Sequence, residues 1–432
     1  CRPAGHPANQ GEAVNGSPAG RHRPRRRGRP LRAGNTDARY YDGEWLNKRQ
    51  RSMHISILNY SRQYDGFHAR SRKEGSRDSV HKKYRALATM MLKELRALGY
   101  EPTSLAKLKK KHIVALLRAW ERQGLTGGTM QNKFSILSQV CKRLRKNDCL
   151  PERPEEVLDD PSRYRVRTVA CTEKAVSTHC TDIETLLAKL DGIDPVIGLQ
   201  VRAMLVYGLR SKEAARLSPH SADKGDHLLI TDGTKGGRPR VVSLYDYKAD
   251  YDDAAQEVVV WDVKPDPAKV ELLERMKRLA RPGRSLIPVQ FTLAQWRRRL
   301  RAAAEQCGLT EKELGTTLHG LRHEYICRQA EKIGGLPRAL RRIASLTPRQ
   351  VRRDRVARQL VALDAGHHDT YTTETYYGPR LEQAPKGLVK RIAQCVRGPV
   401  REPLFLVDAS GRVTPGKGRR IRIVDGLPDW QE

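Results

Sequence analysis

Arginine, lysine and histidine side chains lie in three separated segments at spacings that could bind an anion. Arg210 stands at the start of a predicted helix in YGLRSKEAARL, and Lys235 lies in the turn DGTKGG. In LHGLRHEY, His319 and Arg322 are three residues apart, so they share one face of a helix. Planar guanidinium groups hold the oxygens of a phosphate in pairs, and histidine donates hydrogen bonds or carries protons near neutral pH. Each pattern alone also occurs in helices and turns without a catalytic role.

A further segment, residues 365–378, has the sequence AGHHDTYTTETYYG and adds a nucleophile to this set. A tyrosine hydroxyl can attack and form a covalent intermediate, and a nearby histidine such as His367 can manage its proton. The segment ends in two adjacent tyrosines, Tyr376 and Tyr377. Neighbouring residues of a helix point about 100° apart, so these two side chains cannot both enter one pocket.

The net charge predicts a polyanionic partner. The 432 residues contain 82 Lys and Arg against 49 Asp and Glu, a formal net charge of +33, which favours a nucleic acid. A membrane-surface role is disfavoured, because the sequence has no long basic amphipathic helix and no apolar run of membrane-spanning length. The eight cysteines form no CxxC pair and no zinc-finger spacing, which predicts reduced thiols in a cytosolic protein. The sequence begins with Cys1 and shows no signal peptide, so we expect a truncated start.

Composition and periodicity divide the first part of the chain in two. Residues 1–70 are basic and poor in apolar side chains, so we predict a largely disordered segment, in which RPRRRGRP (23–30) fits an AT-hook or an ordinary basic tail. Residues 71–152 are predicted to be a helical DNA-binding domain, with an apolar stripe at spacings of three and four and Thr126 as a helix N-cap. Basic residues outnumber acidic residues about threefold there, which predicts a DNA-holding face, with a merely solvated face as the alternative. The predicted DNA contacts are Lys82, Lys83, Lys109, Lys110, Lys111 and Arg143.

The remaining chain is predicted to form a second domain and a tail. Within residues 153–395, β-branched runs at 227–231 and 238–244 flank a glycine-rich turn, which predicts a β-hairpin. After VVVW (258–261) the pattern is mainly helical, and residues 396–432 are predicted to be a tail with short strands. The expected fold is therefore mainly α with a small antiparallel β-sheet (α+β).

The chemistry-bearing segments together resemble the motifs of the tyrosine recombinases, the family of phage and mobile-element integrases. Members carry GLRxxExxxL, a lysine in a β-hairpin, HxLRH, and Gly-His followed nine residues later by tyrosine. All of these motifs occur here in that order. The resemblance implies that residues 71–152 are a SAM-like core-binding domain and that residues 153–395 are the catalytic domain.

The resemblance also implies a role for each matched residue. Arg210 and Arg322 would clamp the scissile phosphate of DNA, where charge builds up in the transition state. Lys235 would protonate the departing 5′ oxygen, with a simple phosphate contact as the alternative. His319 and His367 would bond the same phosphate or manage the proton of the nucleophile.

Spacing selects one of the two tyrosines. Nine residues after the Gly-His histidine lies Tyr376, which would attack and become joined to the 3′ phosphate, leaving Tyr377 to pack or to touch DNA. Glu213 would be a supporting carboxylate. His323 and His368 adjoin the motif residues but face elsewhere on a helix, so we expect them to support the site or face DNA.

The sequence departs from the family pattern in the segment before His367. Ala365, preceded by Asp364, stands where leucine is usual, and 45 residues separate Arg322 from His367, about twice the common spacing. The excess includes residues 336–360, which hold eight arginines and one acid and are predicted to form one or two inserted helices. Added phosphate contacts, a solvated surface helix or a contact between protomers would each explain their charge.

The resulting hypothesis is a site-specific recombinase that acts as a homotetramer on two DNA duplexes carrying attachment sites. A DNA-bending or directionality protein is a candidate partner, and the bacterial cytoplasm is the expected location. We expect no metal and no other cofactor, because the sequence has neither a GxxxxGK[ST] loop nor an acidic cluster for two metal ions. The alternatives are a type IB topoisomerase-like enzyme, which shares the chemistry, and a DNA-binding protein that has lost catalysis.

Overall fold

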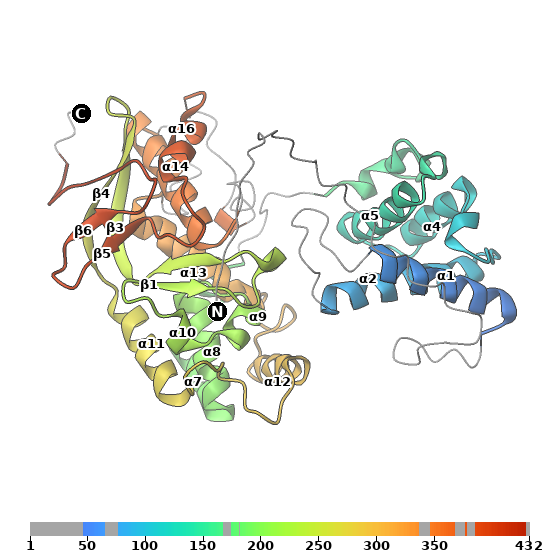
Figure 1. Ribbon diagram of the computed structural model, residues 1–432, viewed down its shortest axis with the longest axis horizontal. Coiled ribbons are helices and arrows are strands. Elements are labelled where there is room, and N and C mark those ends of the chain that lie inside the picture. Colours follow the sequence, from blue (N-terminus) through green and yellow to red (C-terminus); the bar gives the residue numbers. More distant parts are fainter. Residues whose placement is uncertain are drawn as a thin grey trace, which may run out of the picture. The chain divides into compact units, whose positions relative to one another are not determined.

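The chain forms two compact units, residues 1–166 and 167–432 (Figure 1). The computed structural model describes residues 46–64, 77–166, 174–180, 182–336, 346–367, 376–377 and 385–428, with the backbone alone for 77–82 and 236. Among the described residues, no helix is both long enough and apolar enough to cross a membrane.

The first unit is helical. Its main elements are α1 (Lys48–Tyr64), α2 (Arg77–Thr89), the π-helical turn η1 (Met90–Glu94), α3 (Leu95–Ala97), α4 (Lys110–Arg122) and α5 (Gly127–Arg143). The predicted apolar stripe is confirmed, since Tyr84, Leu87, Met91 and Leu95 are all buried in one core. Thr126 caps α5 as predicted, because its side chain accepts a hydrogen bond from the Thr129 N–H.

Helix α1 differs from the sequence prediction, which assigned residues 1–70 to a largely disordered segment. Met53, Ile57 and Leu58 are at most 2% exposed and belong to the core of the first unit. Because these residues are four positions and one position apart, they lie on one face of the helix, and this face packs against the core of the first unit. The AT-hook candidate at 23–30 lies outside the described residues.

The first unit ends at Val166, whereas the sequence prediction set the boundary at residue 152. Leu158 is buried in the core of this unit. The buried carboxylate of Glu121, on α4, accepts hydrogen bonds from the backbone N–H groups of Asp159 (3.0 Å) and Asp160 (2.8 Å). These contacts attach the proline-rich segment after residue 152 to the helical unit.

The second unit combines helices with three small sheets. Its helices are α6 (Val176–His179), α7 (Ile183–Ile193), α8 (Pro195–Val206), α9 (Ser211–Arg216), α10 (Pro219–Ala222), α11 (Pro267–Leu279), α12 (Leu293–Gln306), α13 (Leu318–Ile333), α14 (Pro348–Asp364) and α16 (Leu388–Val396). Its strands are β1 (His227–Ile230), β2 (Arg240–Ser243), β3 (Tyr245–Asp252), β4 (Glu257–Pro265), β5 (Phe405–Val407), β6 (Val413–Pro415) and β7 (Ile421–Ile423). The mainly α fold with small sheets is confirmed.

Strand pairing agrees with the predicted hairpin and adds a strand that the sequence prediction lacked. β1 and β2 pair antiparallel, with His227 opposite Ser243. β3, which was not predicted, pairs antiparallel with β4. The tail strand β7 pairs with β4 in the parallel direction, from Val258 opposite Ile421 to Val260 opposite Ile423, so the sheet is not purely antiparallel.

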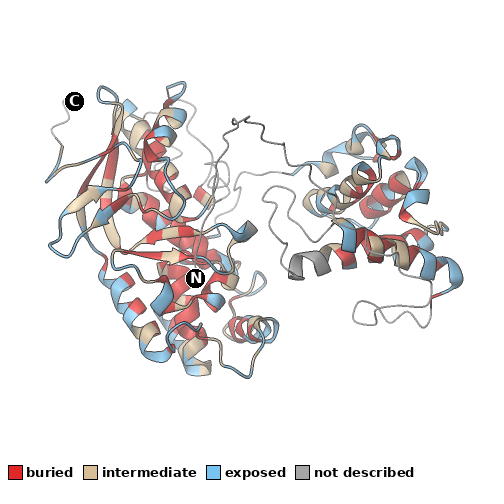
Figure 2. Cartoon of the chain, viewed as in Figure 1, coloured by how far each residue is buried: buried red, intermediate tan, exposed pale blue. Residues whose placement is uncertain are grey.

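Helix α13 contributes side chains to two apolar cores of the second unit. Buried residues gather in the interior of this unit and exposed residues on its outer helices (Figure 2). Leu321 packs with the core formed around α7, α8, α9, α11 and α12. Tyr325, Ile326 and Ile333, one to three turns further on, pack with β3, β4, α14 and α16 in the other core. The first turn of α13 is thereby fixed at the junction of the two cores.

Helix α14 is a core element, although the sequence suggested an arginine-rich insertion at 336–360. Arg358 and Asp354 are at most 1% exposed and form an ion pair of 2.7 Å. Arg352 and Arg353 pair with the buried carboxylate of Asp250 on β3, at 3.1 and 3.5 Å. These arginines are therefore engaged within the fold, and the solvated-helix hypothesis is wrong for them.

Candidate active site

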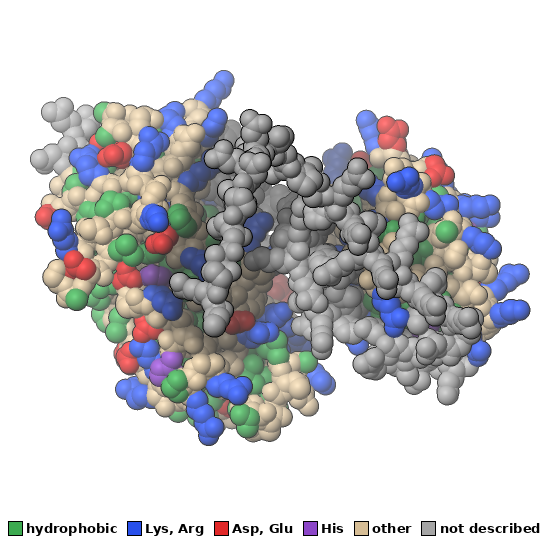
Figure 3. All heavy atoms as spheres, in the orientation of Figure 1, with side chains coloured by type: hydrophobic (Ala, Val, Ile, Leu, Met, Phe, Trp, Pro, Cys, Tyr) green, Lys and Arg blue, Asp and Glu red, His purple; other side chains and the backbone are tan. Residues whose placement is uncertain are grey.

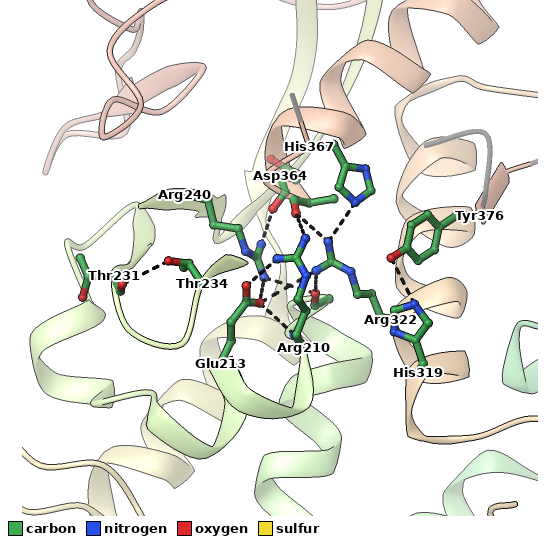
Figure 4. Close-up of polar contacts among 12 residues, drawn as sticks. Arg210, Glu213, Thr231, Thr234, Arg240, His319, Arg322, Asp364, His367 and Tyr376 are labelled. Atoms are coloured by element: carbon green, nitrogen blue, oxygen red, sulfur yellow. Dashed lines mark hydrogen bonds and ion pairs between the residues drawn. The ribbon is translucent and has the colours of Figure 1, made fainter. Parts of the chain in front are cut away.

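Arg322, on α13, is fully buried against the segments that contain Gly208 and Ala365 (Figure 4). Its guanidinium group donates hydrogen bonds to the carbonyl oxygens of Gly208 and, at 2.6 Å, Ala365. The same group lies 3.2 Å from Nε2 of His367. Burial, followed by the charges of Arg240 and Arg210, lowers the pKa of Arg322 to about 10, so the group remains a cation at neutral pH.

Arg210 is held by a buried carboxylate one helical turn away. Arg210 precedes α9, and its backbone N–H and Nη1 donate to the two oxygens of Glu213, at 2.8 and 2.6 Å. Burial alone would raise the pKa of Glu213, but Arg240, Arg210 and Arg322 outweigh it and lower the pKa to about 2. Glu213 therefore stays ionised and orients the guanidinium group of Arg210, whose side chain is 23% exposed.

Tyr376 lies among three histidine rings. Its hydroxyl is 3.2 Å from Nε2 of His319, and its ring stacks on that of His367 with centroids 5.2 Å apart. The ring of His323 is closer still, at 4.3 Å, so the expectation that His323 faces away from the motif residues is wrong. The Arg322 guanidinium lies 5.8 Å from the centre of the same Tyr376 ring. His319 and Arg322 therefore lie on one face of α13, as predicted.

The site keeps His319 and His367 neutral. Burial, then Arg322 and Arg210, lower the pKa of His367 to about 2. The same causes, in the same order, lower the pKa of His319 to about 4. His319 is exposed to solvent, which weakens the effect of burial, but the nearby cations act in the same direction. At neutral pH, Nε2 of His319 can therefore accept the proton of the Tyr376 hydroxyl.

Tyr377 points into the apolar core instead. It is 0% exposed, its hydroxyl donates to the carbonyl oxygen of Leu336 at 2.7 Å, and Arg358 lies 4.7 Å from its ring centre. A hydroxyl so placed serves the packing of the fold, and it has no open path to a phosphate. The two adjacent tyrosines thus occupy different environments, as their helical geometry requires.

Lys235 stands at the open side of the site. It begins the short turn η6 (Lys235–Gly237) between β1 and β2, and its side chain is exposed. With Arg210 and His367 it lines a cavity of about 570 Å³ that extends to the segment after α16. Lys235 is thus close enough to these groups to contribute to the low pKa of His367.

The predicted DNA contacts in the first unit have different environments. Lys109, Lys110 and Lys111 are exposed at the start of α4, and Lys83 is partly exposed. Arg143 packs against the rings of Tyr60 and Tyr64 and donates a hydrogen bond of 3.2 Å to the Tyr60 hydroxyl. The side chains of Lys82 and His368 lie outside the described residues. Lys and Arg side chains are spread over the visible face of both units (Figure 3).

Sequence reasoning overlooked Arg240, the first residue of β2. It is 3% exposed and donates to Oε2 of Glu213 at 2.9 Å, so it completes the buried charge cluster in Figure 4. A signal was present in the sequence, because Arg240 has the same strand phase as Val242 and Leu244, which are both buried. An arginine on the inner face of a strand needs a carboxylate partner. Among the described residues, no group of three or more His, Cys, Asp or Glu side chains could hold a metal ion.

Two family models match the chain in sequence order. The model described as phage integrase, N-terminal, matches residues 67–147, and the model described as integrase matches residues 165–328. The second match includes Arg210, Lys235, His319 and Arg322. The chain belongs to the integrase family of tyrosine recombinases. It is an enzyme of site-specific DNA recombination, and neither a type IB topoisomerase nor a non-catalytic DNA-binding protein is favoured.

Solved structures similar to this tyrosine recombinase include two integrases. The Tn1549 transposon integrase in complex with a circular intermediate DNA is 15% identical, with 78% of this chain and 99% of that chain covered and a TM-score of 0.42. The lambda integrase (residues 75-356) bound to DNA is 12% identical, with 77% and 99% covered and a TM-score of 0.46. No curated protein matches the recombinase sequence.

Proposed function

We propose that this recombinase cuts one DNA strand by attack of the Tyr376 hydroxyl on the scissile phosphate. The Tyr376 oxygen forms a bond to phosphorus, the bond from phosphorus to the 5′ oxygen breaks, and a 3′-phosphotyrosyl linkage results. His319 takes the tyrosine proton, and Lys235 gives a proton to the departing 5′ oxygen. The observation that carries the assignment is the 3.2 Å contact of the Tyr376 hydroxyl with a neutral His319 beside Arg322.

Arg210 and Arg322 stabilise the charge that develops on the phosphate. Both guanidinium groups are held by the fold before DNA arrives, through Glu213 for Arg210 and through backbone carbonyl groups for Arg322. Donors fixed in advance need no reorganisation during the reaction, and one such donor contributes about 10²–10³ in rate. Because Arg322 is fully buried, with the Tyr376 ring 5.8 Å from its guanidinium group, neighbouring side chains must move before a phosphate can reach it.

Rejoining reverses these steps on a partner strand. The 5′ hydroxyl of a second DNA molecule gives its proton to Lys235 and attacks the phosphotyrosyl linkage. The bond from phosphorus to the Tyr376 oxygen breaks, and Tyr376 leaves with a proton returned from His319. The linkage conserves the energy of the phosphodiester bond, so the exchange consumes no nucleotide. We place a homotetramer on two attachment sites, with the exposed lysines of α4 on the DNA backbone, in the bacterial cytoplasm. A DNA-bending protein as a further partner would set the direction of exchange.

A covalent-capture experiment tests this function and finds the substrate at the same time. The full chain is incubated with a library of nicked, random-sequence duplexes, in which cleavage near the nick releases a short fragment and prevents rejoining. After denaturation, DNA that remains bound to protein is sequenced and the modified peptide is identified by mass spectrometry. We expect a shared sequence linked to Tyr376, and none with Tyr376→Phe. Capture that persists in Tyr376→Phe would refute the assignment, and relaxation of any supercoiled plasmid without recombination would favour a topoisomerase.

A further inference from the structure

The strand that follows the Lys235 turn carries a buried arginine with three separate attachments. Arg240 donates to Oε2 of Glu213 at 2.9 Å and to the carbonyl oxygen of Gly208 at 3.2 Å, and its other terminal nitrogen donates to the carbonyl oxygen of Asp364. Its side chain is only 3% exposed, so it cannot meet DNA directly. Arg240 thus connects β2 with both segments that hold Arg322.

The turn before His367 lies in close contact with the side chain of Arg240. Gly366 has a φ of +64°, and a Cβ atom at that position would lie 2.7 Å from Cδ of Arg240. The turn before His367 therefore packs directly on the aliphatic part of the arginine. Such close packing fixes the guanidinium group against Glu213.

We infer that Arg240 is a positioning residue for DNA cleavage, which acts through Glu213 to hold Arg210 at the scissile phosphate. Glu213 uses one oxygen for Nη1 of Arg210 and the other for Arg240 and the backbone N–H of Arg210. Without Arg240, this oxygen loses its strongest cationic neighbour and keeps only the bond from the backbone N–H of Arg210, so the carboxylate holds Arg210 less firmly. The inference rests on the proposed function, because Arg210 matters only if a phosphate is attacked here.

The charges around Glu213 also predict a change in pH dependence. The carboxylate faces Arg210 at the start of α9, Arg240 on β2 and Arg322 on α13, and Arg240 contributes most to the low pKa of Glu213. Loss of this cation raises the pKa of Glu213, because burial then acts against fewer positive charges. Cleavage by an Arg240→Met variant should therefore fail at a higher pH than cleavage by the wild type.

The test measures the rate of covalent adduct formation by the full chain on the captured duplex. Arg240→Met should slow this rate about ten- to hundredfold, less than the 10²–10³ expected for loss of a direct donor, with unchanged DNA affinity in gel shifts. Arg240→Lys, which keeps the charge but not all three contacts, should give an intermediate rate with the wild-type acid limit. Arg278→Met, which changes an exposed arginine of α11 that does not line the cavity of Arg210, Lys235 and His367, is the control and should behave as wild type.

Distinct outcomes separate this inference from the proposed function. If the wild type forms no adduct, the proposed function fails. If the wild type forms it and both Arg240 variants match its rate and acid limit, the positioning role is overturned. A duplex with sulfur in place of the 5′ bridging oxygen needs no proton on its leaving group. If this duplex restores the cleavage rate of Arg240→Met, Arg240 acts through Lys235, and the inference is also overturned. Should Arg240→Met not fold, Arg240→Lys decides the question alone.

Discussion

The buried ion pair of α14 should be a main support of the second unit. Asp354 is 0% exposed, accepts from Nε of Arg358 at 2.7 Å and also accepts from the backbone N–H of Leu336 at 3.3 Å. Asp354→Ala leaves the guanidinium of Arg358, 1% exposed, without its buried counter-ion. Removal of one partner from a buried pair costs about 3–5 kcal/mol. At about 1.4 kcal/mol per tenfold, amide protons of α14 should exchange roughly 10²- to 10⁴-fold faster.

Hydrogen exchange of the full chain, followed by mass spectrometry of α14 peptides, measures this effect. Asp253→Ala is the matched control, because Asp253 pairs with Arg352 at 3.7 Å but is 53% exposed, and exposed pairs contribute at most about 1 kcal/mol. The double variant Asp354→Leu with Arg358→Met removes both charges and should recover most of the protection. If Asp354→Ala exchanges no faster than Asp253→Ala, this pair does not hold α14 and our account of the arginine-rich segment is wrong.

Three further predictions concern the active site. Tyr377→Phe should form the covalent adduct at the wild-type rate but lower the free energy of unfolding by about 1–3 kcal/mol in denaturant titrations, because the hydrogen bond to the Leu336 carbonyl is lost. Tyr376→Phe should form no adduct and keep the wild-type free energy of unfolding. An inactive Tyr377→Phe would contradict the assignment. Lys235→Ala should slow cleavage about 10²–10⁴-fold without a change in thermal unfolding, and a duplex with sulfur in place of the 5′ bridging oxygen should restore the cleavage rate. If cleavage stays slow on that duplex, Lys235 is not the general acid. Because the pKa of His367 is lowered to about 2, the unfolded chain binds a proton at this residue below about pH 6.5 and the folded chain does not. The free energy of unfolding should therefore fall by up to about 1.4 kcal/mol per pH unit, and His367→Gln should flatten this slope in urea titrations from pH 6.5 to 4. Equal slopes in the two proteins would place the histidine in a more open site.

The hairpin is confirmed and the predicted site residues lie close together, and both expectations followed from local signals. Turn glycines between β-branched runs define β1 and β2, and a spacing of three defines the face of α13 that carries His319 and Arg322. The choice of Tyr376 over Tyr377 also came from spacing, and the burial of Tyr377 supports it without testing its chemistry.

Features that depend on distant partners were missed or misassigned. The arginines of α14 suggested a surface for phosphate, because the carboxylates that neutralise them include Asp250, about a hundred residues earlier on β3. Burial of such charges cannot be inferred from the composition of one segment. β3 itself has a signal that was overlooked, since Tyr245, Tyr247, Ala249 and Tyr251 alternate with polar residues at the period of a strand.

The parallel pairing of β7 with β4 has a consequence for synthesis on the ribosome. Val258, Val259 and Val260 are fully buried, yet their hydrogen-bonding partners, Ile421 to Ile423, are translated much later. Until β7 emerges, β4 presents an apolar open edge on which other chains can add a strand. We therefore expect nascent chains that stall before residue 421 to associate with chaperones or to aggregate, and truncated chains that end there to be poorly soluble.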